Sequence, residues 1–327
     1  MTEEEESAET LADRRKVQEG YELVNAIWKT QGAAVALRYC HHLPHGRALP
    51  LGLDLAEIDR IIAGMDSFYR GGYRDWPTQW FKAGDDYLER GRKAQDDGHM
   101  QTAAQMLFSA ASCYHLAGYM HHDIGRLLPE TRRSMLRAVE LYWEAAPHFS
   151  PPAIMADIPF DGTTLRGFLR LPRGVERHAP CVILIGGANS NMINMHAVSD
   201  YYLERGIAAL GFDGPGQGEF RARTGRPLRV QDFDRALSAA ADWLQQDARI
   251  AVAVSESMGG LPAECWRSMR PPATNGSGPL WRTPPRSILP ISSSKHFCRP
   301  WSPIGWRCAV SLARRHWRRD RVSYASN

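Results

Sequence analysis

The spacing of apolar residues predicts that the first 150 residues are helical. In the segment 55–65, Leu55, Ile58 and Ile62 fall on one face of a helix, as expected for a helix that packs against a core. Apolar positions elsewhere in this region also recur at helical intervals. They predict helical turns within 11–28 and helices over 76–93, after Gly98, and over 129–146. The Ser-Pro-Pro stretch at 150–152 ends the pattern. We therefore expect an N-terminal helical domain over residues 1–150 that serves as a cap or in dimerisation.

After residue 152 the pattern changes to short apolar runs that alternate with helices. Two runs, 153–160 and 164–171, flank the Asp161-Gly162 pair and predict a β-hairpin. Further strands are expected over 181–185, 207–213 and 249–254, with helices over about 196–205 and 230–246 between them. This alternation is typical of right-handed βαβ crossovers, which build a parallel sheet with catalytic groups at the carboxyl ends of its strands. The sequence therefore predicts an α/β fold, of which residues 151–261 form a part.

The last segment, residues 262–327, has a different composition. It contains 11 Arg and one Lys against only Glu264 and Asp320, a net charge of +10, and nine prolines interrupt any regular pattern. Residues 1–261 therefore have a net charge of −6, so the overall value of +4 averages two unlike parts. Three interpretations compete: a nucleic-acid-binding tail in which Arg and Trp stack on bases, a disordered surface tail without a role, and out-of-frame translation of a GC-rich gene. We favour the third and rank nucleic-acid binding last.

Composition also narrows the class of protein. No apolar run reaches 18 residues, and the acidic, polar N-terminus lacks the features of a secretory signal. The cysteines are scattered singly, without a CxxC pair: Cys40, Cys113, Cys181, Cys265, Cys298 and Cys308. Two histidine clusters have no acidic or cysteine partner at ligand spacing: His41, His42 and His45, and His115, His121 and His122. We therefore expect a cytoplasmic protein with reduced thiols, no membrane span and no metal ion.

The candidate chemistry follows the strand over 249–254. The stretch Ser255-Glu256-Ser257-Met258-Gly259 matches the nucleophile-elbow pattern G-x-S-x-G except at its first residue. In that pattern a sharp strand-to-helix turn projects the central serine hydroxyl above the sheet. The position after a strand favours an elbow with Ser257 as the nucleophile. A Ser-rich turn without a catalytic role is the alternative.

An acyl-transfer site also needs backbone N–H groups that stabilise the charge on the attacked carbonyl oxygen. One donor would be Met258, directly after the nucleophile. The other is expected in the loop after the strand 181–185, where Gly187 or Ala188 is the natural donor. A phosphate-binding role for this loop ranks low, because neither G-x-x-x-x-G-K-[ST] nor G-x-G-x-x-G occurs there.

Four segments occur in the order found in a known group of enzymes. They are FKAGDDYLERGRKAQDDG, LIGGANSN, GFDGPGQGE and SESMGG, and the string FDGPGQGE is the most specific. Residues 75–260 thereby resemble the α/β-hydrolases with an N-terminal helical domain, typified by dihydroxypseudooxynicotine hydrolase. The resemblance implies a serine-dependent hydrolase of a small carbonyl substrate, either an ester or a carbon–carbon bond next to a ketone. It carries over Ser257 as nucleophile and Met258 with Gly187 or Ala188 as oxyanion donors. It also implies a helical domain that contributes to a homodimer, and its chemistry needs no cofactor.

The acid and the base of the triad do not carry over. The resemblance implies an order of Ser, Asp and then His, but the only Asp after Ser257 is Asp320, which follows both His296 and His316. The resemblance also stops near Gly260. We therefore expect a frameshift or a mispredicted gene after Gly260 and a catalytically impaired chain. A non-enzymatic helical interaction protein with a degenerate hydrolase remnant is the alternative.

Overall fold

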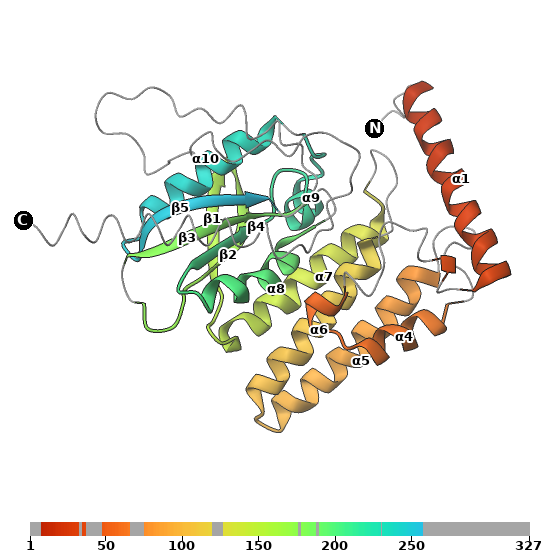
Figure 1. Ribbon diagram of the computed structural model, residues 1–327, viewed down its shortest axis with the longest axis horizontal. Helices are drawn as coiled ribbons and strands as arrows, with labels where there is room; N and C mark the ends of the chain where they lie inside the picture. The colour runs from red at the N-terminus through yellow and green to blue at the C-terminus, as the bar shows by residue number, and fades with distance from the viewer. Residues whose placement is uncertain are drawn as a thin grey trace, which may run out of the picture. The chain divides into compact units, whose positions relative to one another are not determined.

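The chain divides into two compact units. The computed structural model describes residues 8–32, 35–36, 48–65, 75–119, 127–175, 178–187, 190–229 and 231–257. One unit holds the chain up to Ser150 together with Ala222–Pro227, and the other holds Pro151–Arg221 with the chain from Leu228 on. The first unit is helical, and the second contains the sheet (Figure 1).

The helical unit contains the helices that the apolar spacing predicts. Its elements are α1 (Ala8–Gln31), η1 (Leu49–Leu51), α4 (Leu55–Ala63), α5 (Asp75–Asp96), α6 (Met100–Tyr119), α7 (Pro129–Ala145) and η2 (Ala146–His148). The turns expected within 11–28 belong to one continuous helix, α1, which is longer than the pattern suggested. Ile58 and Ile62 are buried as expected, while Leu55 at the start of α4 is exposed.

Helices α5 and α6 form a hairpin around Gly98. The N–H of His99 donates to the carbonyl of Ala94 and that of Gly98 donates to Gln95, which is the Schellman arrangement, and Gly98 has a φ of +77°. The two helices approach closely because small residues face large ones: a Cβ on Gly84 would lie 3.2 Å from the ring of Tyr114. This close approach requires a small residue on α5 where the Tyr114 ring of α6 packs.

The second unit is built on a mixed five-stranded sheet. Its strands are β1 (Ile154–Phe160), β2 (Thr163–Arg170), β3 (Ala179–Ile185), β4 (Ala208–Phe212) and β5 (Ile250–Ser257), and their order is β1-β2-β4-β3-β5. The pairs β4–β3 and β3–β5 are parallel, as the alternation of strands and helices predicts. The hairpin β1–β2 is also present, and β2 joins the parallel strands by pairing antiparallel to β4. The turn of the hairpin has Asp161 at φ 48° and Gly162 at φ 73°, which fits a tight two-residue connection.

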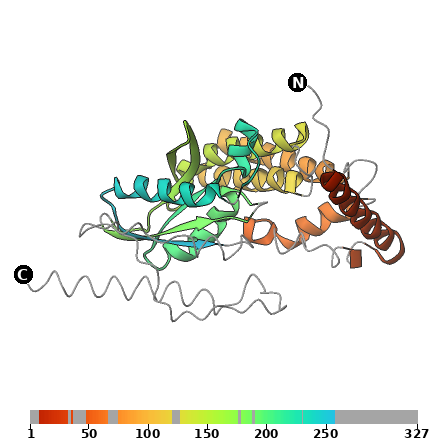
Figure 2. The same cartoon turned by 90° about the horizontal axis from the view of Figure 1, so that it is seen from above.

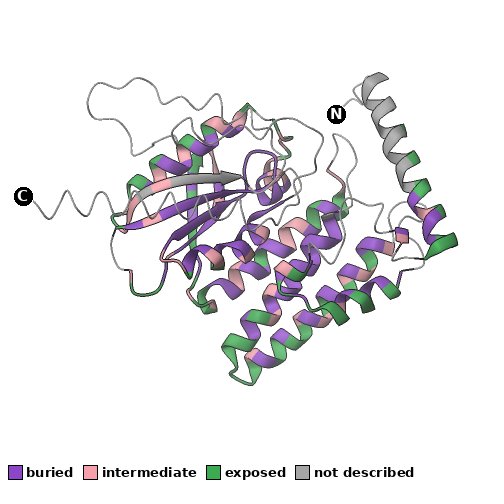
Figure 3. Ribbon diagram, in the orientation of Figure 1, coloured by how far each residue is buried: buried purple, intermediate pink, exposed green. Residues whose placement is uncertain are grey.

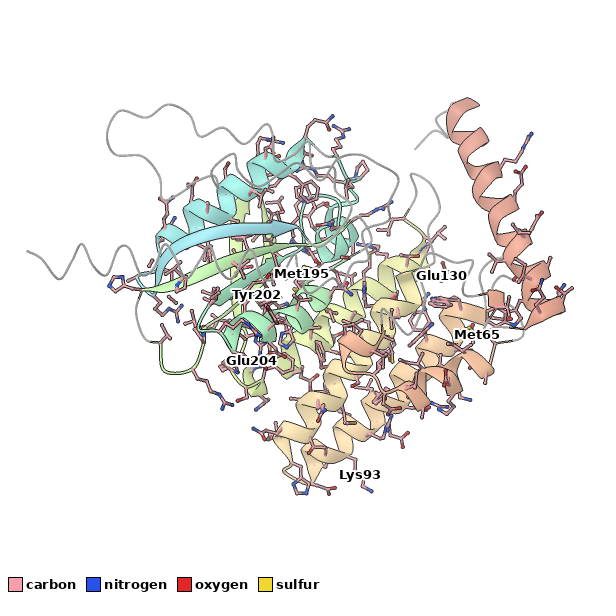
Figure 4. All side chains as sticks on the ribbon, viewed as in Figure 1. Met65, Lys93, Glu130, Met195, Tyr202 and Glu204 are labelled. Carbon is pink, nitrogen blue, oxygen red and sulfur yellow. The ribbon has the colours of Figure 1, made fainter. Side chains whose placement is uncertain are left out.

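Helices cover both faces of the sheet. Helix α8 (Met192–Leu203) packs on β2, β3 and β4, and α10 (Asp232–Gln245) packs on β1 and β5 (Figures 1 and 2). Met195 and Tyr202, which lie two turns apart on α8, are buried, while Glu204 directly after the helix is exposed (Figure 4). Strand β4 is buried along its whole length, as expected for a strand with a neighbour on each side and a helix on each face (Figure 3).

Three boundaries differ from the sequence prediction. Helix α8 begins at Met192 rather than near His196, because Asn191 and Asn194 form a reciprocal capping box that the apolar spacing does not reveal. The stretch GPGQGEF, expected as a loop, runs into a short helix, α9 (Gly218–Thr224). Strand β5 continues to Ser257, so the residues expected in a turn after residue 254 have extended backbone. No described helix is long and apolar enough to cross a membrane.

A buried histidine on α8, His196, makes the stability of the sheet unit sensitive to acid. Burial, and then the nearby positive charge of Arg170, hold the pKa of His196 well below 6.5. Below pH 6.5 the unfolded chain therefore binds a proton that the folded chain does not, and stability falls as the pH is lowered. We expect a loss of about 1.4 kcal/mol per pH unit over that window, measured by urea unfolding at pH 7.5, 6 and 5. His196→Gln should remove this slope, whereas the same change at the exposed His99 should leave it intact.

Candidate functional site

The parallel register of β3 and β5 brings the proposed nucleophile to the Gly-Gly loop. Ser257 is the last residue of β5, and its Cα pairs with that of Ile185, the last residue of β3. Gly186 and Gly187 directly follow Ile185 in the sequence. The carboxyl ends of β3 and β5 therefore lie at the same edge of the sheet. Ser257 is described in its backbone only, and Ala188, Met258 and all three acid and base candidates (His296, His316 and Asp320) lie outside the described residues.

The loop after β3 is tightly packed at its first glycine. A Cβ on Gly186 would lie 2.7 Å from the Cβ of Ser190, so no larger residue fits without moving the backbone. The carbonyl of Gly187 accepts a hydrogen bond from the N–H of Ser190 at 2.9 Å, which turns the chain back toward α8. Gly187 is half-buried, and its own N–H donates to none of the described residues.

A buried carboxylate ties two loops of this edge together. Asp213 follows β4 and is fully buried. Its two oxygens accept hydrogen bonds of 2.6 Å from the N–H of Met192, at the start of α8, and from that of Glu219, at the start of α9. A negative charge is favourable at a helix N-terminus, where the N–H groups lack helical partners. Gly218, directly before Glu219, has a φ of +37°. A Cβ at this position would collide with the Asp213 carboxylate, so glycine is required.

A buried amide from the same loop reaches the glycines after β3. The Gln217 Nε2 donates to the carbonyl of Gly186 at 3.0 Å and to that of Gly187 at 2.6 Å. Its Oε1 accepts from the N–H of Gly214 at 3.0 Å, and only 2% of the residue is exposed. Two hydrogen bonds therefore connect the string FDGPGQGE to the loop that should provide an oxyanion donor.

The described cysteines do not compete with Ser257 as nucleophiles. Cys181 on β3 and Cys113 on α6 are buried and form no disulfide. Burial raises the pKa of both thiols, so neither forms a thiolate at neutral pH.

The residues that sequence reasoning missed are Asp213 and Gln217. The string FDGPGQGE signals a resemblance, but its local pattern gives no role to either side chain. Their partners lie 21 and 31 positions away in the sequence, so only the folded chain shows the contacts. Of the two histidine clusters, His115 alone lies in the described part, where it is buried on α6, and the described residues form no cluster suited to a metal ion.

Comparisons with known proteins agree with this fold. Residues 65–224 match the model of the family described as Esterase FrsA-like. The 2,6-dihydropseudooxynicotine hydrolase of Paenarthrobacter nicotinovorans is 33% identical over 165 residues, which make up 49% of this chain and 43% of that protein. Esterase FrsA of Yersinia enterocolitica is 32% identical over 153 residues, 45% of this chain and 35% of that protein. The chain thus matches less than half the length of these two relatives.

The crystal structure of the 2,6-dihydroxy-pseudo-oxynicotine hydrolase is similar in fold. It superposes with a TM-score of 0.54 at 28% sequence identity and covers 65% of this chain and 57% of its own. The family match includes the glycines after β3 and the string FDGPGQGE, and it ends before β5. Residues 65–224 are thus similar to the FrsA-like esterase family, and the fold of the chain is that of an α/β-hydrolase preceded by helices.

Proposed function

We propose that this chain is a serine hydrolase in which Ser257 attacks the carbonyl carbon of a small-molecule substrate. The pairing of Ser257 with Ile185 carries the proposal, because it sets the serine backbone beside the loop of Gly186 and Gly187. In α/β-hydrolases the nucleophile follows a strand, and an N–H from the loop after a neighbouring strand completes the oxyanion hole. The relation of β5 to β3 in this sheet is the one that such a site requires.

The reaction would begin when the serine Oγ adds to the carbonyl carbon and the carbonyl oxygen becomes an oxyanion. The N–H of Gly187 is one donor to that oxygen, and Ala188 and Met258 are the other candidates from the sequence. The bond from the acyl carbon to the leaving oxygen or carbon would then break, and the leaving group would take up the proton that the serine gave up. The acyl group would remain on Ser257 as an ester. Water would hydrolyse this ester and release the acid. Both ester cleavage and cleavage next to a ketone follow this course.

Turnover should be slow in this chain. A serine hydroxyl needs an imidazole to take its proton and a carboxylate to orient that imidazole. The sequence after Ser257 has no Asp that precedes a His, so the order of Ser, Asp and His that the resemblance implies is not met. We keep the expectation that catalysis is impaired, with the helical unit as a cap or dimer interface.

A covalent label tests the nucleophile without requiring full turnover. We expect a p-nitrophenyl alkylphosphonate to modify Ser257 in the full-length protein, detected by mass spectrometry of the peptide, and Ser257→Ala to abolish the label. Ser255→Ala, two residues earlier, is the matched control and should retain it. Hydrolysis of p-nitrophenyl acetate, measured in parallel, should be weak and should depend on Ser257. A protein that is neither labelled nor active would support the interaction-protein alternative instead.

A further inference from the structure

The string FDGPGQGE contributes a side chain to the proposed oxyanion loop. The Gln217 amide donates to two successive carbonyls, those of Gly186 and Gly187. Two carbonyl oxygens that point at one donor fix the rotation of both glycine residues, which otherwise have the widest conformational freedom. The hydrogen bonds therefore set the direction of this piece of backbone.

The Gln217 amide is itself fixed in one orientation. The side-chain Oε1 of Gln217 accepts a hydrogen bond from the N–H of Gly214. The backbone N–H of Gln217 donates to the carbonyl of Gly214 at 2.9 Å. A flipped amide would place the Oε1 against two carbonyl oxygens and the Nε2 against an N–H group, so only one orientation satisfies all partners. Asp213 holds the far end of the same turn through the N–H of Glu219.

Because the peptide bond is planar, the hydrogen bond from Gln217 to the Gly186 carbonyl also determines the direction of the Gly187 N–H. In a trans peptide the carbonyl of one residue and the N–H of the next point in opposite directions. Because the Gly186 carbonyl points at Gln217, the Gly187 N–H points away from it. We propose that Gln217 is a positioning residue that aims the Gly187 N–H at the oxyanion, an inference that rests on Ser257 being the nucleophile.

The alternative orientation of the loop would oppose catalysis. If the peptide between Gly186 and Gly187 rotated, a carbonyl oxygen would replace the N–H at the position facing the substrate. Its partial negative charge would repel the developing oxyanion, where a fixed donor would stabilise it. Gln217 therefore acts on the reaction through the backbone and does not touch the substrate.

The experiment compares Gln217→Glu with Gln245→Glu, a matched change at an exposed position on α10. A carboxylate at position 217 has nearly the same shape but cannot donate to the two carbonyls. Backbone hydrogen exchange of the peptide that contains residues 186–191 reports on the loop, since the Ser190 N–H is protected by its bond to Gly187. We expect exchange to become about tenfold faster in Gln217→Glu and to be unchanged in Gln245→Glu.

The rate of Ser257 phosphonylation reports on the oxyanion donor. In Gln217→Glu we expect the limiting rate of labelling to fall about 10- to 100-fold, with the concentration for half-saturation nearly unchanged, because only the transition state uses the donor. Leu237→Ala, which opens a cavity under α10, is the control for general destabilisation and should lower the melting temperature without this loss.

Three results would overturn the inference: unchanged exchange in Gln217→Glu, a labelling rate equal to that of Gln245→Glu, or an equal loss of labelling in Leu237→Ala. An unlabelled wild-type protein would contradict the proposed nucleophile instead. Hydrogen exchange alone would then decide whether Gln217 holds the loop.

Discussion

Asp213→Ala should lower the free energy of unfolding by about 4 kcal/mol, because the change leaves two buried N–H groups without their charged acceptor. The carboxylate joins the starts of α8 and α9 through Met192 and Glu219, at 2.6 Å each, and is fully buried. Hydrogen bonds to a charged group are stronger than those between neutral groups. Urea unfolding followed by circular dichroism at 222 nm measures the loss.

Two further variants show whether burial of the charge is the cause. Asp213→Asn keeps the shape and one acceptor oxygen, so we expect a smaller loss of about 2 kcal/mol. Asp157→Ala removes a carboxylate that is 57% exposed and pairs with Arg166 at the surface, and it should cost less than about 1 kcal/mol. A cost for Asp213→Ala as small as that for Asp157→Ala would show that the two loops do not depend on this carboxylate.

Trp80→Ala should destabilise the helical unit by about 4 kcal/mol. Trp80 lies on α5, has no exposed surface, and packs against Trp76 with the ring centroids 5.6 Å apart. Removing an indole ring from such a site takes away its buried apolar surface and leaves a cavity that the surrounding helices only partly fill. The loss is measured as the shift of the urea midpoint at 222 nm.

The neighbouring indole provides a matched comparison. The Trp76 Nε1 donates to the carbonyl of Leu116 at 2.8 Å, whereas the Trp80 Nε1 is buried and has no hydrogen-bond partner among the described residues. Trp76→Phe should therefore cost about 1 kcal/mol more than Trp80→Phe, since only the former breaks a hydrogen bond. Equal costs would mean that packing alone determines the contribution of each ring.

The sequence predicted the elements of the sheet unit well because its buried strands are short apolar runs with clear ends. The hairpin at Asp161-Gly162 and the parallel strands β3 and β5 follow directly from such runs. The length of β5 was underestimated, since Ser255 and Ser257 interrupt the apolar pattern although their backbone is extended. Polar residues at the end of a strand carry no periodic signal.

The strand order and the network around the loop could not be derived in the same way. That β4 lies between β2 and β3 depends on contacts between distant segments, and no local spacing encodes it. The capping of α8 by Asn191 and the contacts of Gln217 depend on single hydrogen bonds rather than on a repeated pattern. The roles proposed for Ser257 and Gly187 stay predictions, although the register that relates their backbones agrees with them.

The central place of β4 has a consequence for how the protein is made. On the ribosome the hairpin β1–β2 can form as soon as it emerges, but β3 has no partner until residues 208–212 have been synthesised. During that interval the nascent chain presents the almost entirely apolar segment Ala179–Ile185 to its surroundings. An exposed apolar segment of this kind is prone to aggregation, and pairing with β4 removes that exposure.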